Sequence, residues 1–251
     1  MLYVLCSMSY TLPMSRLDIE LVNRGLARSR TIAQTLIEQG AVLLNDHPAE
    51  KSSTIISPVD KLEVIADLPY VSRAGVKLKK ALDEFGLNPT GLIALDVGAS
   101  TGGFTDCLLQ NSATKVYAVD VGTAQLNPEL KSDPRVISVE QTDIRNLKPL
   151  QKEADLAVID VSFISLTKVL PAVRKFLKPH AKIIALVKPQ FEVGPDIVNK
   201  KGVVADPKVR EKALHDVIAW TEKNNFVFLK KIESPIHGTD GNTEYLIYLS
   251  I

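Results

Sequence analysis

The sequence predicts an α/β protein in which a mostly parallel sheet, with helices on both faces, follows a small α+β segment. After residue 91, short apolar runs alternate with amphipathic helical runs, and a glycine-rich turn follows the first apolar run. Residues 14–66 differ, with two short helices followed by short strands. The length of 251 residues is also long for one compact domain, so we expect two.

Composition indicates the class of protein and excludes several kinds of site. The chain is 45% hydrophobic and 24% charged, as expected for a globular protein with a buried core, and its net charge is +1. Cys6, Cys107 and the four dispersed histidines have no metal-binding spacing, so we expect no metal site. No apolar run reaches the length of a membrane span. We expect a cytoplasmic protein in which residues 1–13 form a loose tail.

Two short helices open the first segment. Leu17 and Leu21 have helical spacing, and Gly25 is a natural stop for that helix. Ser29 can cap a second helix. The strands that follow are expected at residues 41–44 and 61–65.

Arginines gather around the turn between these two helices. Arg24, Arg28 and Arg30 lie there, with no acid between Glu20 and Glu38. Grouped guanidinium groups suit phosphate contacts. From composition alone, the three arginines could equally well lie on a solvated surface that binds no phosphate.

The order of residues in this segment resembles the small RNA-binding module named after ribosomal protein S-four. The match includes Ser15-Arg16-Leu17-Asp18, residues 21–30 and residues 33–42. This resemblance implies binding to structured RNA by shape and backbone contacts, with Arg16 joining the three arginines. Asn45-Asp46-His47 stands where the module usually has Asn-Gly, which implies a less tight hairpin.

Residues 67–72 are the expected linker between the domain of residues 14–66 and a second domain of residues 73–251. Pro69 interrupts regular structure there, before the longer alternation of strands and helices begins. A second basic cluster follows without an acid until Asp83, and it could continue an RNA track. Its members are Arg73, Lys77, Lys79 and Lys80.

Seven strands and three long helical stretches are expected in the second domain. The strands are expected at residues 92–96, 115–120, 135–139, 156–160, 182–187, 226–232 and 245–249. The helices are expected at residues 103–110, 166–176 and 207–224. Ligands of such sheets bind outside the carboxyl ends of the strands, so polar residues at those ends are candidate site residues.

The first strand runs into the turn Asp96-Val97-Gly98-Ala99-Ser100-Thr101-Gly102-Gly103-Phe104. Glycines let a ligand approach the backbone, and the following helix offers free amides. Ser100 replaces the glycine of a dinucleotide-binding turn, and the Gly-Lys-Ser/Thr of a phosphate loop is absent. The turn resembles the first motif of class I methyltransferases. That resemblance implies a Rossmann-like methyltransferase fold and S-adenosylmethionine as cofactor, whose ammonium group Asp96 could bind.

Acids at two further strand ends support a nucleoside-containing cofactor. Asp120 ends the second strand, where such sheets carry an acid that accepts hydrogen bonds from ribose hydroxyls. Asp143 and Ile144 follow the third strand, where an acid and an apolar residue typically face adenine. Each acid alone could be a helix cap. The candidate cofactor residues are Asp96, Gly98, Ser100, Gly102, Gly103, Phe104, Asp120, Asp143 and Ile144.

Two lysines and two acids could activate a hydroxyl at the same sheet edge. Asp160 and Lys188 end two strands, and Glu244 precedes the last. The run from Asp160 to Phe163 lacks the prolines of base-amine methyltransferases, which weakens that alternative. Lys188 can act as a base only when it is neutral, which desolvation or a second cation such as Lys77 favours and nearby carboxylates oppose. The geometry decides between these effects.

Five motifs together resemble the TlyA family, also labelled hemolysin A, whose catalytic half is similar to FtsJ-type ribose methyltransferases. They lie at residues 72–78, 96–104, 159–166, 186–192 and 241–245. The resemblance implies 2′-O-methylation of cytidine in ribosomal RNA, with the RNA or the ribosomal subunits as partners. It also implies a catalytic tetrad, in which we expect Lys188 to be the base: Lys77, Asp160, Lys188 and Glu244. Two alternatives are an RNA-binding ribosome-assembly factor with a vestigial methyltransferase half and a membrane-lytic protein.

Overall fold

The computed structural model describes residues 14–38, 41–49, 51–65, 69–200, 202–238 and 241–251. The chain divides into two compact units, residues 1–69 and residues 70–251. The tail expected at residues 1–13 and the first part of the expected linker lie outside the described residues.

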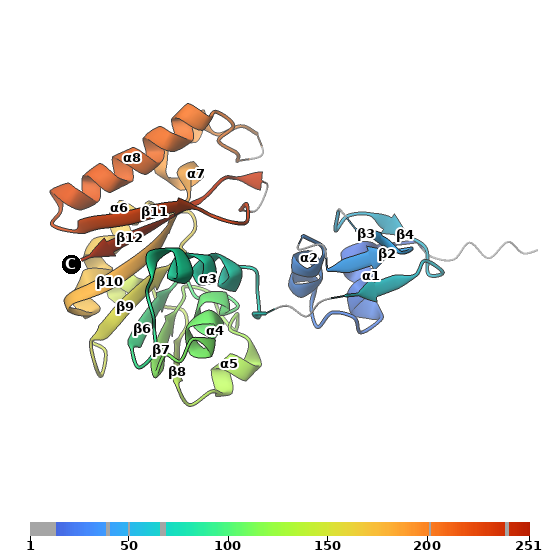
Figure 1. Cartoon of the computed structure of the whole chain (residues 1–251), viewed down its shortest axis with the longest axis horizontal. Helices are drawn as coiled ribbons and strands as arrows, with labels where there is room; N and C mark the ends of the chain where they lie inside the picture. The colour runs from blue at the N-terminus through green and yellow to red at the C-terminus, as the bar shows by residue number, and fades with distance from the viewer. Residues whose placement is uncertain (1–13, 39–40, 50, 66–68, 201, 239–240) are drawn as a thin grey trace, which may run out of the picture. The chain divides into compact units, whose positions relative to one another are not determined.

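The first unit combines two helices with two small sheets (Figure 1). Its helices are α1 (Leu17–Asn23) and α2 (Arg30–Glu38). Strands β1 (Ser15–Arg16) and β4 (Ile55–Ile56) form one antiparallel pair. Strands β3 (His47–Pro48), β2 (Val42–Leu44) and β5 (Leu62–Val64) form the other sheet, in that order. Apolar residues of both helices pack with β2 and β4 in one core, whose members all belong to this unit.

The β2–β3 hairpin is tight, contrary to the expectation drawn from its sequence. Leu44 pairs with His47, which leaves a turn of only Asn45 and Asp46. Both turn residues have positive φ angles, 51° and 65°, a conformation that Asn and Asp adopt more readily than other non-glycine residues. Lys61 Nζ also lies 2.6 Å from Asp46 Oδ1. Aspartate therefore replaces the usual glycine without lengthening the turn.

The second unit is built on one seven-stranded sheet (Figure 1). Its strands are β6 (Ile93–Val97), β7 (Lys115–Val119), β8 (Val136–Val139), β9 (Ala154–Ile159), β10 (Leu177–Val187), β11 (Val227–Glu233) and β12 (Tyr245–Ser250). Their order across the sheet is β11-β12-β10-β9-β6-β7-β8. The five strands from β10 to β8 are parallel, and β12 is antiparallel to both of its neighbours. The chain reverses its direction of progress between β6 and β9, where open α/β sheets bind ligands.

Helices cover both faces of this sheet, as predicted. Helices α3 (Ala74–Phe85), α4 (Gly103–Gln110) and α5 (Pro128–Ser132) contribute to the core on one face. Helices α6 (Leu166–Val173) and α8 (Pro207–Lys223) contribute to the core on the other. Strand residues alternate between the two cores: Leu156 and Val158 face the first, and Ala157 and Ile159 face the second. This two-sided burial explains why the parallel strands are almost continuously apolar.

The structure adds elements that the sequence pattern did not predict. Helix α3 was missed because lysines interrupt its apolar face, and the short helices α5 and α7 (Pro189–Glu192) were missed as well. Strand β10 begins at Leu177 rather than at residue 182, with an irregular register in between. The α7 turn directly follows the carboxyl end of β10 and therefore bears on the candidate site.

Candidate active site

A cavity of about 300 Å³ opens at the carboxyl ends of β6, β7, β8 and β9. One wall is formed where the turn after β6 meets the end of β9. Gly98 has a φ of +84°, and a Cβ atom there would lie 2.4 Å from the carbonyl oxygen of Asp160. Only glycine permits this approach. The cavity volume is at the lower end of the range for small-molecule sites.

Five of the predicted cofactor residues line this cavity: Gly98, Ser100, Asp120, Asp143 and Ile144. Both acids are held in place by local donors. Asp120 Oδ2 accepts a hydrogen bond from Ser100 N at 2.8 Å, and its Oδ1 accepts one from Gly122 N at 2.7 Å. Arg145 donates to the Asp143 carboxylate and lowers its pKa. The cavity therefore carries oriented carboxylates beside the apolar Ile144, a wall that fits a nucleoside.

Gly102, Gly103 and Phe104 lie behind the cavity, where they pack the start of α4. Phe104 is buried in the core. A Cβ atom on Gly103 would lie 2.2 Å from Ser72 Oγ, so the glycine lets α4 approach the segment before α3. We had expected these residues to contact the cofactor. They are not among the residues that line the cavity, so their contact with the cofactor stays a prediction.

Asp96 is also behind the cavity, and its expected contact with an ammonium group stays a prediction. Its side chain is fully buried, and Thr105 Oγ1 donates a hydrogen bond of 2.6 Å to its Oδ2. The other carboxylate oxygen, Oδ1, has no hydrogen-bond partner among the described residues. Burial raises the pKa of Asp96 from 3.8 to about 7. In this structure Asp96 is therefore a buried acid that titrates near neutrality, not a solvent-facing carboxylate.

Lys77 and Glu244 form a buried ion pair across 167 positions of the chain. Lys77 Nζ lies 2.5 Å from Glu244 Oε2, and the two side chains are 6% and 3% exposed. Gly238 packs directly against the acid, because a Cβ atom there would lie 2.2 Å from Glu244 Oε1. Helix α3 and the loop before β12 are therefore joined by opposite charges at the edge of the sheet.

Lys188 and Asp160 form a second ion pair, directly after β10 and β9. Lys188 Nζ lies 2.7 Å from Asp160 Oδ1 and donates a hydrogen bond of 2.9 Å to Ser162 Oγ. The two charged side chains are 12% and 17% exposed, so this pair is more accessible to solvent than the first. Asp160 and Ser162 also line the cavity. This pair is thus the one that adjoins the candidate cofactor site.

The sheet register brings both ion pairs to the same edge. Val187, at the end of β10, pairs with Tyr245, at the start of β12. Lys188 and Glu244 are the next residues on these neighbouring strands, and Asp160 follows β9 on the other side of β10. The four predicted catalytic residues are therefore joined in two pairs at the carboxyl edge of the parallel strands.

An exposed aromatic side chain beside the second pair was not singled out from the sequence. Phe163 is 90% exposed and has a φ of +63°, an unusual conformation for a bulky residue. Its ring lies 5.0 Å from the ring of Phe191, and Lys188 Nζ lies 6.0 Å from the Phe191 centroid. Phe191, which could have been simple core, is half-buried at this edge. The spacing Asp160-x-x-Phe163, which resembles that of base-amine methyltransferases, was the available signal.

The predicted RNA-binding arginines of the first unit are paired with acids of the same unit. Arg16 and Arg30 both contact the buried carboxylate of Asp18, whose pKa they lower. Arg24 contacts Glu20 and donates to backbone carbonyls near the start of β5. The stretch between Glu20 and Glu38 has no acid in sequence, but Glu20 and Asp18 contact these arginines in the fold, and RNA binding by the arginines stays a prediction. Arg28 also has a partner within the structure.

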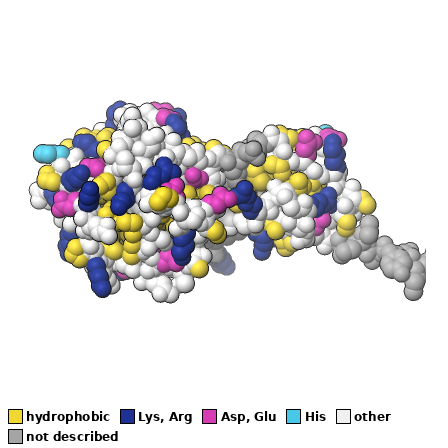
Figure 2. All heavy atoms as spheres, turned by 90° about the horizontal axis from the view of Figure 1, so that it is seen from below, with side chains coloured by type: hydrophobic (Ala, Val, Ile, Leu, Met, Phe, Trp, Pro, Cys, Tyr) yellow, Lys and Arg dark blue, Asp and Glu magenta, His cyan; other side chains and the backbone are white. Residues whose placement is uncertain are grey.

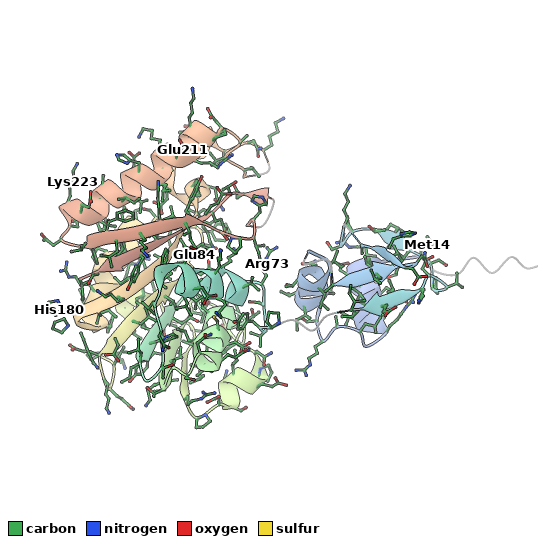
Figure 3. All side chains as sticks on the ribbon, in the orientation of Figure 1. Met14, Arg73, Glu84, His180, Glu211 and Lys223 are labelled. Atoms are coloured by element: carbon green, nitrogen blue, oxygen red, sulfur yellow. The ribbon has the colours of Figure 1, made fainter. Side chains whose placement is uncertain are left out.

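The second basic cluster is likewise interspersed with acids. On the exposed face of α3, Lys79 pairs with Asp83, and Lys80 pairs with Glu84. Arg73 precedes this helix and Glu84 lies near its end (Figure 3). Figure 2 shows the same mixture more widely, with basic and acidic side chains alternating over the visible face of each unit. Recognition of RNA by this chain would have to depend on shape as well as on charge.

Comparison with protein families divides the chain as the fold does. Residues 70–251 match the model of FtsJ-like methyltransferases, and residues 15–62 match the S4 domain. Among solved structures, "Putative hemolysin from Streptococcus thermophilus" is 41% identical, with a TM-score of 0.75, and the match covers 95% of this chain and 89% of that one.

Relatives with two different names are similar to this chain. The 16S/23S rRNA (cytidine-2'-O)-methyltransferase TlyA of Mycobacterium tuberculosis is 44% identical, over 94% of this chain and 89% of its own length. Hemolysin A of Brachyspira hyodysenteriae is 42% identical, over 94% of this chain and 100% of its own length. The similarity to both extends over the two units.

Proposed function

The chain belongs to the FtsJ-like methyltransferases, in the TlyA group with an amino-terminal S4 domain, and from this premise we propose its reaction. The proposed reaction is methylation of the ribose 2′-hydroxyl of cytidine in ribosomal RNA, with S-adenosylmethionine as the methyl donor. The observation that carries the proposal is the Lys188–Asp160 pair, which adjoins a cavity suited to a nucleoside. The S4 domain and the names of the relatives support RNA as the acceptor. Because ribosomal RNA is a cytoplasmic substrate, the proposed location of the protein is the cytoplasm.

The cofactor fits residues of the cavity wall. Asp120 is suited to ribose hydroxyls, and Asp143 and Ile144 are suited to the edge and face of adenine. Gly98 leaves room for close approach to the backbone. S-adenosylmethionine, when bound, supplies an electrophilic methyl group on a sulfonium centre. The remaining chemistry belongs to the residues at the edge of the sheet.

Lys188 is the proposed general base. Because Lys188 Nζ lies in an ion pair with Asp160, 2.7 Å away, the amine must first release its own proton to solvent. It then accepts the proton of the ribose hydroxyl at Nζ, and Asp160 stabilises the ammonium that results. Ser162 Oγ fixes the direction of the amine through its 2.9 Å hydrogen bond. The Lys77–Glu244 pair is too deeply buried to meet RNA freely, so we assign it the positioning of this edge. The exposed ring of Phe163 offers a surface on which the target base can stack.

Substitution of Lys188 by alanine tests this assignment. Lys188→Ala should abolish methyl transfer to ribosomal RNA, because the hydroxyl loses its proton acceptor. The affinity for S-adenosylmethionine should change little, since Lys188 is not among the cavity-lining residues. Transfer is measured with radiolabelled cofactor, and affinity by calorimetry. The matched control is Lys182→Ala, on the strand that leads to Lys188, where the amine contacts Ser250 instead. Retained transfer by Lys188→Ala would exclude it as the base.

Calorimetry tests the first alternative, and a liposome leakage assay tests the second. A vestigial enzyme that assists ribosome assembly would bind RNA but not S-adenosylmethionine. A membrane-lytic protein, as the name of the Brachyspira relative suggests, would release dye from liposomes. Within the described residues, none of the helices has the length and apolar character needed to cross a bilayer.

A further inference from the structure

Two segments carry the contacts around Lys188. The first is the loop of residues 160–165 after β9, and the second is the α7 turn after β10. They touch through the Lys188–Asp160 ion pair, through the hydrogen bond from Lys188 to Ser162 and through the two phenylalanine rings. All three contacts depend on the distance between the two segments. A contact that fixes this distance therefore also fixes the position of Lys188 Nζ.

Glu192 joins the two segments. Ser165 Oγ donates a hydrogen bond of 2.6 Å to Glu192 Oε2, and Leu166 N donates one of 2.9 Å to Glu192 Oε1. Ser165 is also the N-cap of α6, where its Oγ accepts from Thr167 N. Both carboxylate oxygens of the last α7 residue are thus bound at the point where the loop after β9 becomes a helix.

We propose that Glu192 is a positioning residue, whose carboxylate clamps the α7 turn to the start of α6 and so holds Lys188 against Asp160. The proposal rests on the function proposed above, in which Lys188 is the base. A carboxylate suits this place, because it can accept from both donors at once and because it lies at the positive end of the α6 dipole. An amide in the same position would have one acceptor oxygen for two donors.

The position of Glu192 predicts which step it affects. Glu192 is not among the residues that line the cavity, and the cofactor-facing acids Asp120 and Asp143 belong to other loops. Loosening the clamp should therefore displace the amine without changing the cofactor wall. A displacement of about 1 Å at a reacting group can lower a rate roughly 100-fold.

The test compares Glu192→Gln, Glu192→Ala and Ser165→Ala in the full-length protein. We expect kcat for methyl transfer to ribosomal RNA to fall roughly 100-fold in Glu192→Ala and roughly tenfold in Glu192→Gln, which keeps part of the clamp. The Kd for S-adenosylmethionine, measured by calorimetry, should stay within about twofold of wild type. Adding Ser165→Ala to Glu192→Ala should lower kcat no further, because one clamp is lost only once.

Glu211→Ala, an exposed acid on α8 (Figure 3), is the matched control and should have wild-type kcat. Wild-type kcat in the Glu192 variants would overturn the clamp. So would a parallel loss of cofactor affinity, which a general disturbance of the fold would produce. If Glu192→Ala does not fold, the Gln and Ser165 variants carry the test. Absence of transfer in the wild-type protein would instead refute the proposed function, and the clamp with it.

Discussion

Replacing Lys77 with methionine should cost far more stability than replacing a neighbouring lysine on the same helix. Methionine has a similar length but no charge, so Lys77→Met leaves the carboxylate of Glu244, 3% exposed, without its ammonium partner. Breaking a buried pair in this way typically destabilises a protein by about 3–5 kcal/mol. For a domain of this size, that corresponds to a fall in Tm of roughly 6–20 °C.

The chain provides its own probe and control. Trp220 is the single tryptophan, and it packs against Phe226 in the second unit, so its fluorescence reports the unfolding of that unit in urea. Lys80→Met removes an exposed pair with Glu84 and should cost no more than about 1 kcal/mol. The double variant Lys77→Met/Glu244→Leu replaces the buried pair with apolar groups and should recover most of the loss.

These measurements separate the structural role of the pair from its role in catalysis. We expect the double variant to be stable but to transfer no methyl groups. The sheet edge beside Lys188 would then lack the charges of both Lys77 and Glu244. The reasoning fails if Lys77→Met costs no more than Lys80→Met. It also fails if the double variant is as unstable as the single one, since Glu244 would then not be the partner whose charge is left uncompensated.

Two further predictions concern the cavity. Burial raises the pKa of Asp96 from 3.8 to about 7. Between about pH 4 and pH 7 the folded protein therefore holds a proton on Asp96 that the unfolded chain has lost. The free energy of unfolding should fall as the pH rises from about 4 to 7 and then level off. Asp96→Asn should remove this decline and raise the free energy of unfolding by at most about 4 kcal/mol at pH 8. If urea unfolding shows the same pH dependence for the wild-type protein and the variant, this prediction is wrong. Gly98→Ala should lower the affinity for S-adenosylmethionine at least about tenfold, or about 1.4 kcal/mol, by calorimetry, because a Cβ 2.4 Å from the Asp160 carbonyl forces the cavity wall to move. Gly91→Ala has a similar φ of +78° but open space, so equal effects of the two would refute the steric reasoning.

Much of the second unit could be predicted from its sequence, because buried parallel strands are apolar on both faces. All seven strands were expected, and α4 was expected at its observed bounds. Helix α3 escaped notice because one of its buried positions is Lys77, and a lysine is rarely buried unless it is paired. Its partner, Glu244, lies 167 positions away in the sequence, so a local sequence pattern does not reveal the pair.

The candidate-site residues that follow strands could be predicted from the sequence. The side chains that those residues contact in the fold could not. Asp120 and Asp143 line the cavity, because residues that follow parallel strands meet at one edge. Asp96 lies within β6 rather than after it, and its side chain is buried and accepts a hydrogen bond from Thr105 on α4. The arginines of the first unit show the same limit, because the acid that binds two of them, Asp18, lies outside the acid-free stretch.

The position of β12 has a consequence for how the protein is made. Among the described strands β12 comes last in chain order, yet it lies between β10 and β11, and Glu244 directly precedes it. A growing chain can therefore fold its S4 unit while the partner of Lys77 does not yet exist. On the proposed function, products of interrupted translation that lack β12 would occupy the RNA without modifying it. Such fragments would act as competitors of the finished enzyme rather than as weak forms of it.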